Sequence, residues 1–444
     1  MPTAMKVLLI TTSLTSGGAA IACRRNYEAL SRYGVDVRVL VLHELDNLSR
    51  EMQRRVEALS SRRGSLSRSW WYNRLERLEI LLRNGRSCRN LFRFSSARWG
   101  YDPSRHEWAS WADVIHLHWV NHGMLRLGAL EGLRELGKPV FWTMHDLWPV
   151  LGGCHLPFVW QERESLLCTR ISEGCGYCPL LSSRRKNDLS QYVASRKRRA
   201  SLRGFHLIAV SQAEASLASA GCLSQGFSKP EVLPNPLNLS CFCPGEVDET
   251  RTFEGYCPSR KYILVAAARL DDRGKGAVLL REMLEHFAFQ AASLAEQTTL
   301  LLVGQERDAK ILAALPIDAK HLGSISQEED LINLYRLSHV VISTSLYETF
   351  GQSLSEALAC GTPVLSFAGH GAEDLVRPGE NGFLSRPYDA RQMASQLVQL
   401  LTSEDEYLPK VCHSSVEWLD YSRFAPDLLK LYHASLEDRT PVSI

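Results

Sequence analysis

Hydrophobic and polar positions along the chain alternate between short apolar runs and longer stretches with helical periodicity. The runs "KVLLITTSL", "VDVRVLVL", "DVIHLHWV", "KPVFWTMHD" and "FHLIAVS" read as strands, and helical patterns such as "AIACRRNYEALSRYG" stand between them. Continuous apolar strands that alternate with helices predict a parallel sheet covered on both faces.

The same alternation restarts in the second half, with the runs "KYILVAAARL", "TTLLLVGQ", "KHLGSI", "HVVISTSL" and "TPVLSF". The proline-rich stretch "EVLPNPLNLSCFCPGE" breaks both patterns and is the predicted linker. We therefore expect an α/β protein with two doubly wound domains, at residues 1–235 and 236–425, followed by a C-terminal helix and tail at 426–444. Such domains bind ligands at the carboxyl ends of their strands.

Composition fits this picture. Of 444 residues, 45% are hydrophobic and 23% are charged, as in soluble globular proteins. No apolar run reaches the roughly 18 residues of a spanning helix, and the N-terminus reads as a buried strand and not as a signal peptide. Twelve cysteines in so long a chain do not indicate a disulfide framework. We expect a cytoplasmic protein.

Charge is unevenly spread, although the net charge is only +2. The insertion at residues 50–105 carries 14 arginines and 5 acids, interleaved with Trp70, Trp71, Leu75 and Leu78. A basic segment with aromatics and leucines at helical spacing can lie on an anionic membrane surface. The alternative is a helical insertion that packs its apolar side on its own domain. Nucleic-acid binding is disfavoured, because no nucleic-acid module accompanies the charge.

A loop at residues 151–180 carries Cys154, Cys168, Cys175 and Cys178. The two-residue gap in "CGYC" is that of a zinc knuckle, and four thiolates form a structural zinc site. Buried free thiols are the alternative. In "VIHLHWV", His116 and His118 alternate onto one strand face, but no third carboxylate or cysteine ligand stands nearby in the sequence, so we expect them to line the interdomain cleft or a polar pocket.

Candidate binding chemistry lies in "YETFGQSLSEALACGTPV", residues 347–364. The pattern predicts a helix from Phe350, with Thr349 as N-cap and Gln352 completing a capping box. Its N-terminus would open at the carboxyl edge of the sheet, where backbone N–H groups suit a phosphate and Gly351 permits close approach. Glu348 would lie on the loop before the helix, nearer the reacting group. Glu356, two turns further along, suits sugar hydroxyls. A solvated polar helix face is the alternative.

A second motif, "ARLDDRGKG", places Arg269 and Lys275 six residues apart around a turn at the end of a predicted strand. Two fixed cations at the same sheet edge can neutralise a diphosphate.

The spacing of Glu348 and Glu356 is the E-x7-E pattern, and the chain resembles retaining glycosyltransferases of family 4, which have the GT-B fold. The "SGGAA" turn and "LVRPGENGFL" occur in the same order as in that family. The segment "WTMHDLWPVLGGCH" to "GCGYCP" resembles the subgroup that builds exopolysaccharides such as colanic acid.

The resemblance implies two Rossmann-like domains that face each other across a cleft, with the C-terminal helix crossing back. It also implies roles for individual residues. Arg269 and Lys275 would hold the diphosphate of a nucleotide sugar, with backbone donors near Phe350, Gly351 and Gln352. Glu356 would bind the ribose. Glu348 and His145, the latter beside Asp146, would act at the reacting centre. Gly17 and Gly18 would form the glycine loop.

The implied activity is transfer of a hexose from a UDP- or GDP-sugar to a glycan or lipid-linked acceptor in bacterial surface polysaccharide synthesis (EC 2.4), without a catalytic metal cofactor. The enzyme would work in the cytoplasm or peripherally at the inner membrane face. The alternatives are a sugar-nucleotide epimerase or phosphorylase with the same fold, and a non-catalytic membrane-associated relative. A Rossmann oxidoreductase is disfavoured, because "TSLTSGGAA" is not G-x-G-x-x-G.

Overall fold

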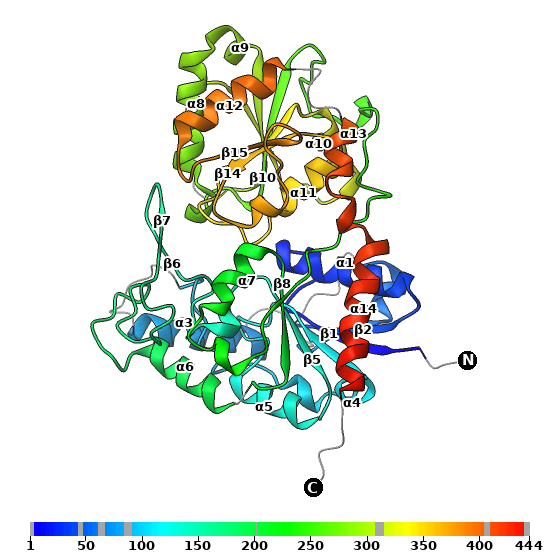
Figure 1. Ribbon diagram of the computed structural model, residues 1–444, viewed down its shortest axis with the longest axis vertical. Coiled ribbons are helices and arrows are strands. Elements are labelled where there is room, and N and C mark those ends of the chain that lie inside the picture. Colours follow the sequence, from blue (N-terminus) through cyan, green and yellow to red (C-terminus); the bar gives the residue numbers. More distant parts are fainter. Residues whose placement is uncertain are drawn as a thin grey trace. The chain divides into compact units, whose positions relative to one another are not determined.

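The computed structural model describes residues 4–42, 48–60, 67–83, 91–200, 202–306, 315–403 and 409–438. Residues 61–66 and 84–90 of the basic insertion, and the last residues of the tail, lie outside this range. The chain divides into two compact units (Figure 1). The first consists of Met1–Val159, Leu167–Pro236 and Ser422–Ile444, and the second of Trp160–Leu166 and Leu237–Tyr421. The stretch Trp160–Leu166 thus groups with the second unit, and Ser422–Ile444 groups with the first.

The first unit contains a parallel sheet in the order β3-β2-β1-β4-β5-β8-β9. Its strands are β1 (Lys6–Ile10), β2 (Asp36–Val41), β3 (Val56–Ala58), β4 (Val114–Leu117), β5 (Val140–Met144), β8 (Phe205–Ala209) and β9 (Glu231–Val232). The helices of this unit are α1 (Gly18–Arg32), α2 (Arg50–Gln53), α3 (Arg68–Arg83), α4 (Glu107–Trp111), α5 (Leu127–Glu135), α6 (Leu189–Arg199) and α7 (Gln212–Ser219). A separate two-stranded sheet joins β6 (Phe158–Trp160) and β7 (Ser165–Leu167). Strand order reverses between β1 and β4, and such a switch point is where doubly wound sheets bind ligands.

The second unit contains a six-stranded parallel sheet in the order β12-β11-β10-β13-β14-β15. Its strands are β10 (Lys261–Arg269), β11 (Thr298–Gln305), β12 (Asp318–Gly323), β13 (Val340–Ser343), β14 (Val364–Phe367) and β15 (Gly382–Ser385). The helices are α8 (Ala277–Gln290), α9 (Ala292–Glu296), α10 (Glu328–Leu337), α11 (Gln352–Ala359), α12 (Ala390–Thr402) and α13 (Pro409–Ser414). Figure 1 shows α8 and α12 on one side of this sheet and α10 and α11 on the other. The switch point lies between β10 and β13.

Continuous burial explains why the apolar runs form central strands. All residues of β13 and β14 are buried, as expected for strands with helices on both faces. Strand β15 lies partly within the "LVRPGENGFL" segment and was not predicted. It begins with Gly382 and is only four residues long, with two half-buried residues in the middle, so it has no continuous apolar run.

The last helix, α14 (Tyr421–Glu437), belongs to the first unit although it follows the whole second unit in the chain. Its Tyr432 is fully buried, and the hydroxyl is 2.5 Å from His116 Nδ1 on β4. This confirms the expected return of the C-terminal helix. None of the described helices is long and apolar enough to cross a membrane.

Candidate active site

A pocket opens in the second unit at the switch point of its sheet. The last residues of β10 and β13 line it, together with the loops that follow them and the first turn of α8, and Lys275 and Glu348 contribute the charged side chains. Ligand sites of doubly wound sheets are found at this position.

Backbone contacts hold the two loops of this pocket together. Leu346 N–H donates to Gly274 O at 2.8 Å, and Thr344 Oγ1 donates to Lys275 O at 3.0 Å. Gly276 has φ +67°, and a Cβ at this position would lie 1.9 Å from Thr344 O. Only glycine permits this close approach, and the approach fixes the position of Lys275.

Lys275 and Glu348 form an ion pair across the two loops. Lys275 Nζ donates to Glu348 Oε1 at 2.7 Å, and Ser345 Oγ donates to the same oxygen at 2.6 Å. Burial would raise the pKa of the Glu348 carboxyl, but the charge of Lys275 and the hydrogen bonds from Lys275 and Ser345 outweigh it and lower that pKa below its ordinary value. Glu348 is therefore an anion at neutral pH.

Arg269, at the end of β10, is held by Asp271. Its Nε and Nη2 donate to the two carboxylate oxygens at 3.1 and 2.8 Å. This two-point contact orients the planar guanidinium, and 42% of the Arg269 side chain stays exposed. Both predicted diphosphate cations thus have an acidic neighbour, and both keep solvent-accessible surface.

Helix α11 begins at Gln352, with Gly351 as N-cap at φ 101°. The prediction of a start at Phe350 with a Thr349 capping box was wrong, because the left-handed turn at Gly351 starts the helix later, and no described side chain caps it. An N-terminus without a side-chain cap retains donors for an anion. The Gln352 Nε2 atom is buried without a hydrogen-bond partner among the described residues.

Two other predicted residues of this motif are buried. Phe350 is 2% exposed, so its side chain belongs to the core and only its backbone is available to a ligand. Glu356 is 5% exposed and accepts a hydrogen bond from Tyr335 Oη at 2.7 Å. It does not line the pocket that Lys275 and Glu348 share.

His370 is a candidate that the sequence prediction missed. It follows β14 at the same sheet edge, its Nδ1 accepts from Ala372 N–H at 3.4 Å, and its buried Nε2 has no partner among the described residues. Burial lowers the pKa of His370 to about 4, against the opposing charge of Glu348. Its place directly after an apolar strand, in "SFAGHG", was the available signal.

In the first unit, three histidines stack at the carboxyl ends of β4 and β5. The ring centroids of His116 and His118 lie 4.6 Å apart, and those of His118 and His145 lie 5.3 Å apart. His145 Nε2 is 3.0 Å from His118 Nδ1, and His116 Nε2 is 2.7 Å from Thr143 Oγ1. Burial lowers the pKa of His145 to about 4 and that of His116 to about 3, so these rings are neutral at physiological pH.

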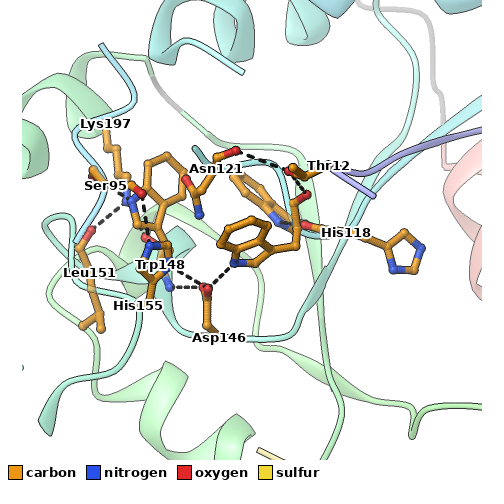
Figure 2. A network of polar contacts seen from close by, with 11 residues as sticks. Thr12, Ser95, His118, Asn121, Asp146, Trp148, Leu151, His155 and Lys197 are labelled. Atoms are coloured by element: carbon orange, nitrogen blue, oxygen red, sulfur yellow. Dashed lines mark hydrogen bonds and ion pairs between the residues drawn. The ribbon is translucent and has the colours of Figure 1, made fainter. Parts of the chain in front are cut away.

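Asp146 fixes the loop that follows His145. Its carboxylate accepts from Trp119 Nε1 and His155 Nδ1, both at 2.7 Å, and from Trp148 N–H at 2.9 Å (Figure 2). Burial would raise the pKa of Asp146, but His155 and these hydrogen bonds lower it below its ordinary value. Asp146 is thus an anion that positions neighbouring groups.

The predicted glycine loop lies at the same edge of the first sheet. Gly17, with φ 90°, is the N-cap of α1, which begins at Gly18. Gly17 O accepts from Ala20 and Ile21 N–H, both at 3.1 Å.

Cys154, Cys168, Cys175 and Cys178 form no disulfide bond in the described part of the chain. Cys175 Sγ lies 3.8 Å from Cys222 Sγ, and burial raises the pKa of the Cys154 thiol well above its ordinary value. Within the described residues, no group of three or more His, Cys, Asp or Glu side chains is arranged to hold a metal ion. Structural zinc at these cysteines stays a prediction.

Comparison with known families decides the classification. The model of "Glycosyltransferase Family 4" matches residues 16–240, half of the chain, and that of "Glycosyl transferases group 1" matches residues 249–412. The chain belongs to glycosyltransferase family 4. The predicted family is confirmed by these matches, and the GT-B fold class by the two Rossmann-like units and by the structures to which the chain is similar.

Among curated relatives, the chain is similar to D-inositol 3-phosphate glycosyltransferase 1 of Catenulispora acidiphila. The two are 27% identical over 214 residues, which are 45% of this chain and 50% of the relative. The family 4 chain thus spans about half the length of the curated relatives it matches.

Two solved structures share the fold over nearly the whole chain. Anabaena HepE in complex with UDP-glucose gives a TM-score of 0.62 at 17% identity, covering 97% of this chain and 100% of HepE. Sucrose-phosphate synthase of Thermosynechococcus elongatus gives 0.65 at 18% identity, covering 97% and 98%.

Proposed function

We propose that this family 4 protein is a retaining glycosyltransferase that moves a hexose from a nucleoside diphosphate sugar to a hydroxyl acceptor. The observation that carries the proposal is the ion pair of Lys275 and Glu348, 2.7 Å apart in a pocket at the β10–β13 switch point. The family membership and the UDP-glucose complex of the structurally similar HepE support a nucleotide-sugar donor.

In this proposal the second unit binds the donor. Arg269 and Lys275 contact the diphosphate, and the backbone N–H groups at Gly351 and Gln352 add donors to its oxygens. Glu356 binds the ribose hydroxyls. Glu356 Oε2 accepts a hydrogen bond from Tyr335 Oη. In this role the ribose hydroxyls would donate to its other carboxylate oxygen, Oε1.

The reaction breaks the bond between the sugar C1 and the diphosphate oxygen and forms a bond from C1 to the acceptor oxygen on the same face. The acceptor proton passes to the departing diphosphate. The protein contributes mainly by stabilising the charge that develops on the leaving group, with Arg269 and Lys275 as its cations. Glu348 contacts the donor sugar and holds Lys275 in place.

The first unit contributes His145 and the glycine loop of Gly17 and Gly18. Because burial keeps His145 neutral, its imidazole can donate one hydrogen bond to the donor sugar or to the acceptor hydroxyl. Its Nε2 is 3.0 Å from His118 Nδ1, and when His118 donates in this contact, the proton of His145 lies on Nδ1, which can then donate to the substrate.

For the acceptor we propose a glycan or lipid-linked saccharide of a bacterial surface polysaccharide, on the resemblance of residues 142–179 to the exopolysaccharide subgroup. Such an acceptor would place the enzyme at the inner face of the membrane. A small phosphorylated polyol is the second candidate, because the curated relatives are named D-inositol 3-phosphate glycosyltransferases.

The test is a donor and acceptor screen with the purified protein. UDP- and GDP-sugars are incubated with lipid-linked saccharides and with D-inositol 3-phosphate, and released nucleoside diphosphate and glycosylated product are measured together. We expect stoichiometric nucleotide release and product with one donor. Epimerised nucleotide sugar without release, or no nucleotide binding at all, would contradict a transferase.

A further inference from the structure

Helix α3 buries its two acidic side chains and exposes several of its large apolar ones. Glu76 and Glu79 are 1% and 8% exposed, whereas Trp71, Leu78 and Leu82 are 55%, 50% and 62% exposed. Surface helices of globular proteins show the opposite distribution. The apolar residues of the basic insertion therefore divide: Ile80 and Phe94 pack in the core of their own unit, whereas Trp71, Leu78 and Leu82 stay largely exposed.

Specific contacts fix this orientation of the helix. Glu76 Oε1 accepts from Ala97 N–H at 2.8 Å, and Glu79 Oε1 accepts from Arg98 Nη1 at 2.8 Å. Ile80, on the same side, is fully buried. Turning the apolar side inward would break the contacts of both carboxylates, so exposure of the leucines is part of the folded state.

The exposed side chains form one stripe. Trp71, Leu75, Leu78 and Leu82 stand at i, i+4, i+7 and i+11, which places them along a single helix face. We call these four residues the α3 apolar stripe. Soluble monomers seldom expose contiguous apolar patches of this kind unless the patch binds something.

Only cationic charge accompanies the stripe on this helix. Arg68, Arg74 and Arg83 are exposed, while the helix's two acids are both buried. An apolar stripe bordered by arginines matches the interface of an anionic bilayer, where apolar side chains enter the acyl boundary and cations contact the headgroups.

We propose that the α3 apolar stripe and its arginines dock this protein on an anionic lipid surface. A second copy of the chain fits this face poorly, since a twofold contact would bring arginines against arginines. The inference deepens the proposed lipid-linked acceptor and rests on that proposal only for its biological purpose, because the surface itself is independent of the transferase site.

The experiment is vesicle flotation of the full chain with phosphatidylglycerol-containing and with pure phosphatidylcholine vesicles. The variants are the triple substitution Trp71→Ser, Leu78→Ser, Leu82→Ser and the pair Arg68→Gln, Arg74→Gln. Phe289→Ser on α8 is the matched control, because Phe289 is 90% exposed and lies far from α3 in the sequence. Thermal unfolding checks that each variant folds, and nucleotide release with a soluble acceptor reports the transferase separately.

We expect the wild type and Phe289→Ser to float with anionic vesicles, less so at high salt. The triple variant should bind at least about tenfold more weakly, since it removes most of the apolar surface that enters the acyl boundary. The arginine pair should lose the preference for anionic lipid. Equal binding to both vesicle types, or unchanged binding of the triple variant, would overturn the proposal. So would a wild-type dimer that the triple substitution makes monomeric. If neither the wild type nor any variant releases nucleotide, the result contradicts the proposed transferase activity and leaves the docking surface to the vesicle data.

Discussion

Lys275 and Glu348 are 73 residues apart in the sequence, yet their side chains meet at 2.7 Å where the loops after β10 and β13 touch. The acid keeps the ammonium in one place and partly neutralises it before any donor is present. A diphosphate that enters the pocket would compete with Glu348 for the same cation. Glu348 can therefore hold Lys275 in position until a diphosphate binds, and its carboxylate then becomes available to the donor sugar.

Glu348→Gln should lower kcat by about 10²-fold while the unfolding temperature changes little, because the amide neither positions Lys275 nor carries charge near the donor sugar. Glu348 and Lys275 both keep solvent contact, so loss of the pair costs little stability. Steady-state kinetics and thermal unfolding measure the two effects. Glu380→Gln, at an exposed acid in the same unit, is the control. Unchanged kcat in Glu348→Gln would exclude a role in the reaction.

Gly276→Ala should destabilise the protein and weaken nucleotide binding together. The new Cβ would lie 1.9 Å from Thr344 O, so the loop that carries Lys275 must shift away from β13. Gly323→Ala is a matched control with φ +69° and no atom within 4 Å of its new Cβ. We expect about 1–2 kcal/mol of destabilisation for the control from backbone strain alone, and a larger value with weaker nucleotide binding for Gly276→Ala. Equal effects of the two substitutions on both quantities would contradict the close approach.

Part of this site follows from the sequence and part does not. Arg269, Lys275 and the glycine before α11 are readable because each follows an apolar strand, and strand ends of a parallel sheet share one edge. The Lys275–Glu348 pairing is not readable, since it depends on the register of β10 against β13 and on the Gly274–Leu346 backbone contact.

Local misreadings have equally physical causes. Thr349 and Gln352 fit a capping box in sequence, but the left-handed backbone at Gly351 moves the helix start beyond it. His370 was not predicted, because a single histidine after a strand has no second residue whose spacing would mark it as part of a site. The α3 stripe shows the same limit, because helical periodicity identifies two faces and does not say which one turns inward.

The histidine stack predicts a pH dependence of stability. His116 has a folded-state pKa of about 3, against about 6.5 in an unfolded chain. The unfolded state therefore binds more protons below pH 6.5, and stability is lost as the pH falls from there toward the folded-state pKa. The titratable side chains next to His116 are His118 and His145, and its neutral contacts are Tyr432 and Thr143. The pKa values of His118 and His145 are lowered as well.

Chemical denaturation at several pH values between 4 and 7 measures this effect. We expect His116→Gln to reduce the slope of unfolding free energy by up to about 1.4 kcal/mol per pH unit between pH 4 and 6, the value for one proton. His433→Gln, at an exposed histidine of α14, is the control. A slope that is the same in wild type and His116→Gln would mean that His116 is charged in the folded protein.

The loop cysteines allow a direct check of the zinc hypothesis drawn from the sequence. A tetrahedral site would bring the four sulfurs of Cys154, Cys168, Cys175 and Cys178 to about 2.3 Å from one metal. The hypothesis predicts about one zinc per chain by elemental analysis, lost in Cys178→Ser and retained in Cys222→Ser. Purified protein that contains no zinc and in which all four thiols react with a thiol reagent would contradict the zinc hypothesis.

The central claim is that Arg269 and Lys275 bind the diphosphate of the donor, and one measurement addresses it most directly. Calorimetric titration of UDP and GDP is compared between wild type, the double variant Arg269→Ala, Lys275→Ala, and Arg273→Ala, which removes an exposed cation of the same loop. We expect the double variant to lose at least about 10²-fold in affinity for the nucleotide that the wild type binds, since hydrogen bonds to charged groups contribute about 1.5–3 kcal/mol each. Arg273→Ala should bind as the wild type does. Full nucleotide affinity and turnover in the double variant would contradict the account.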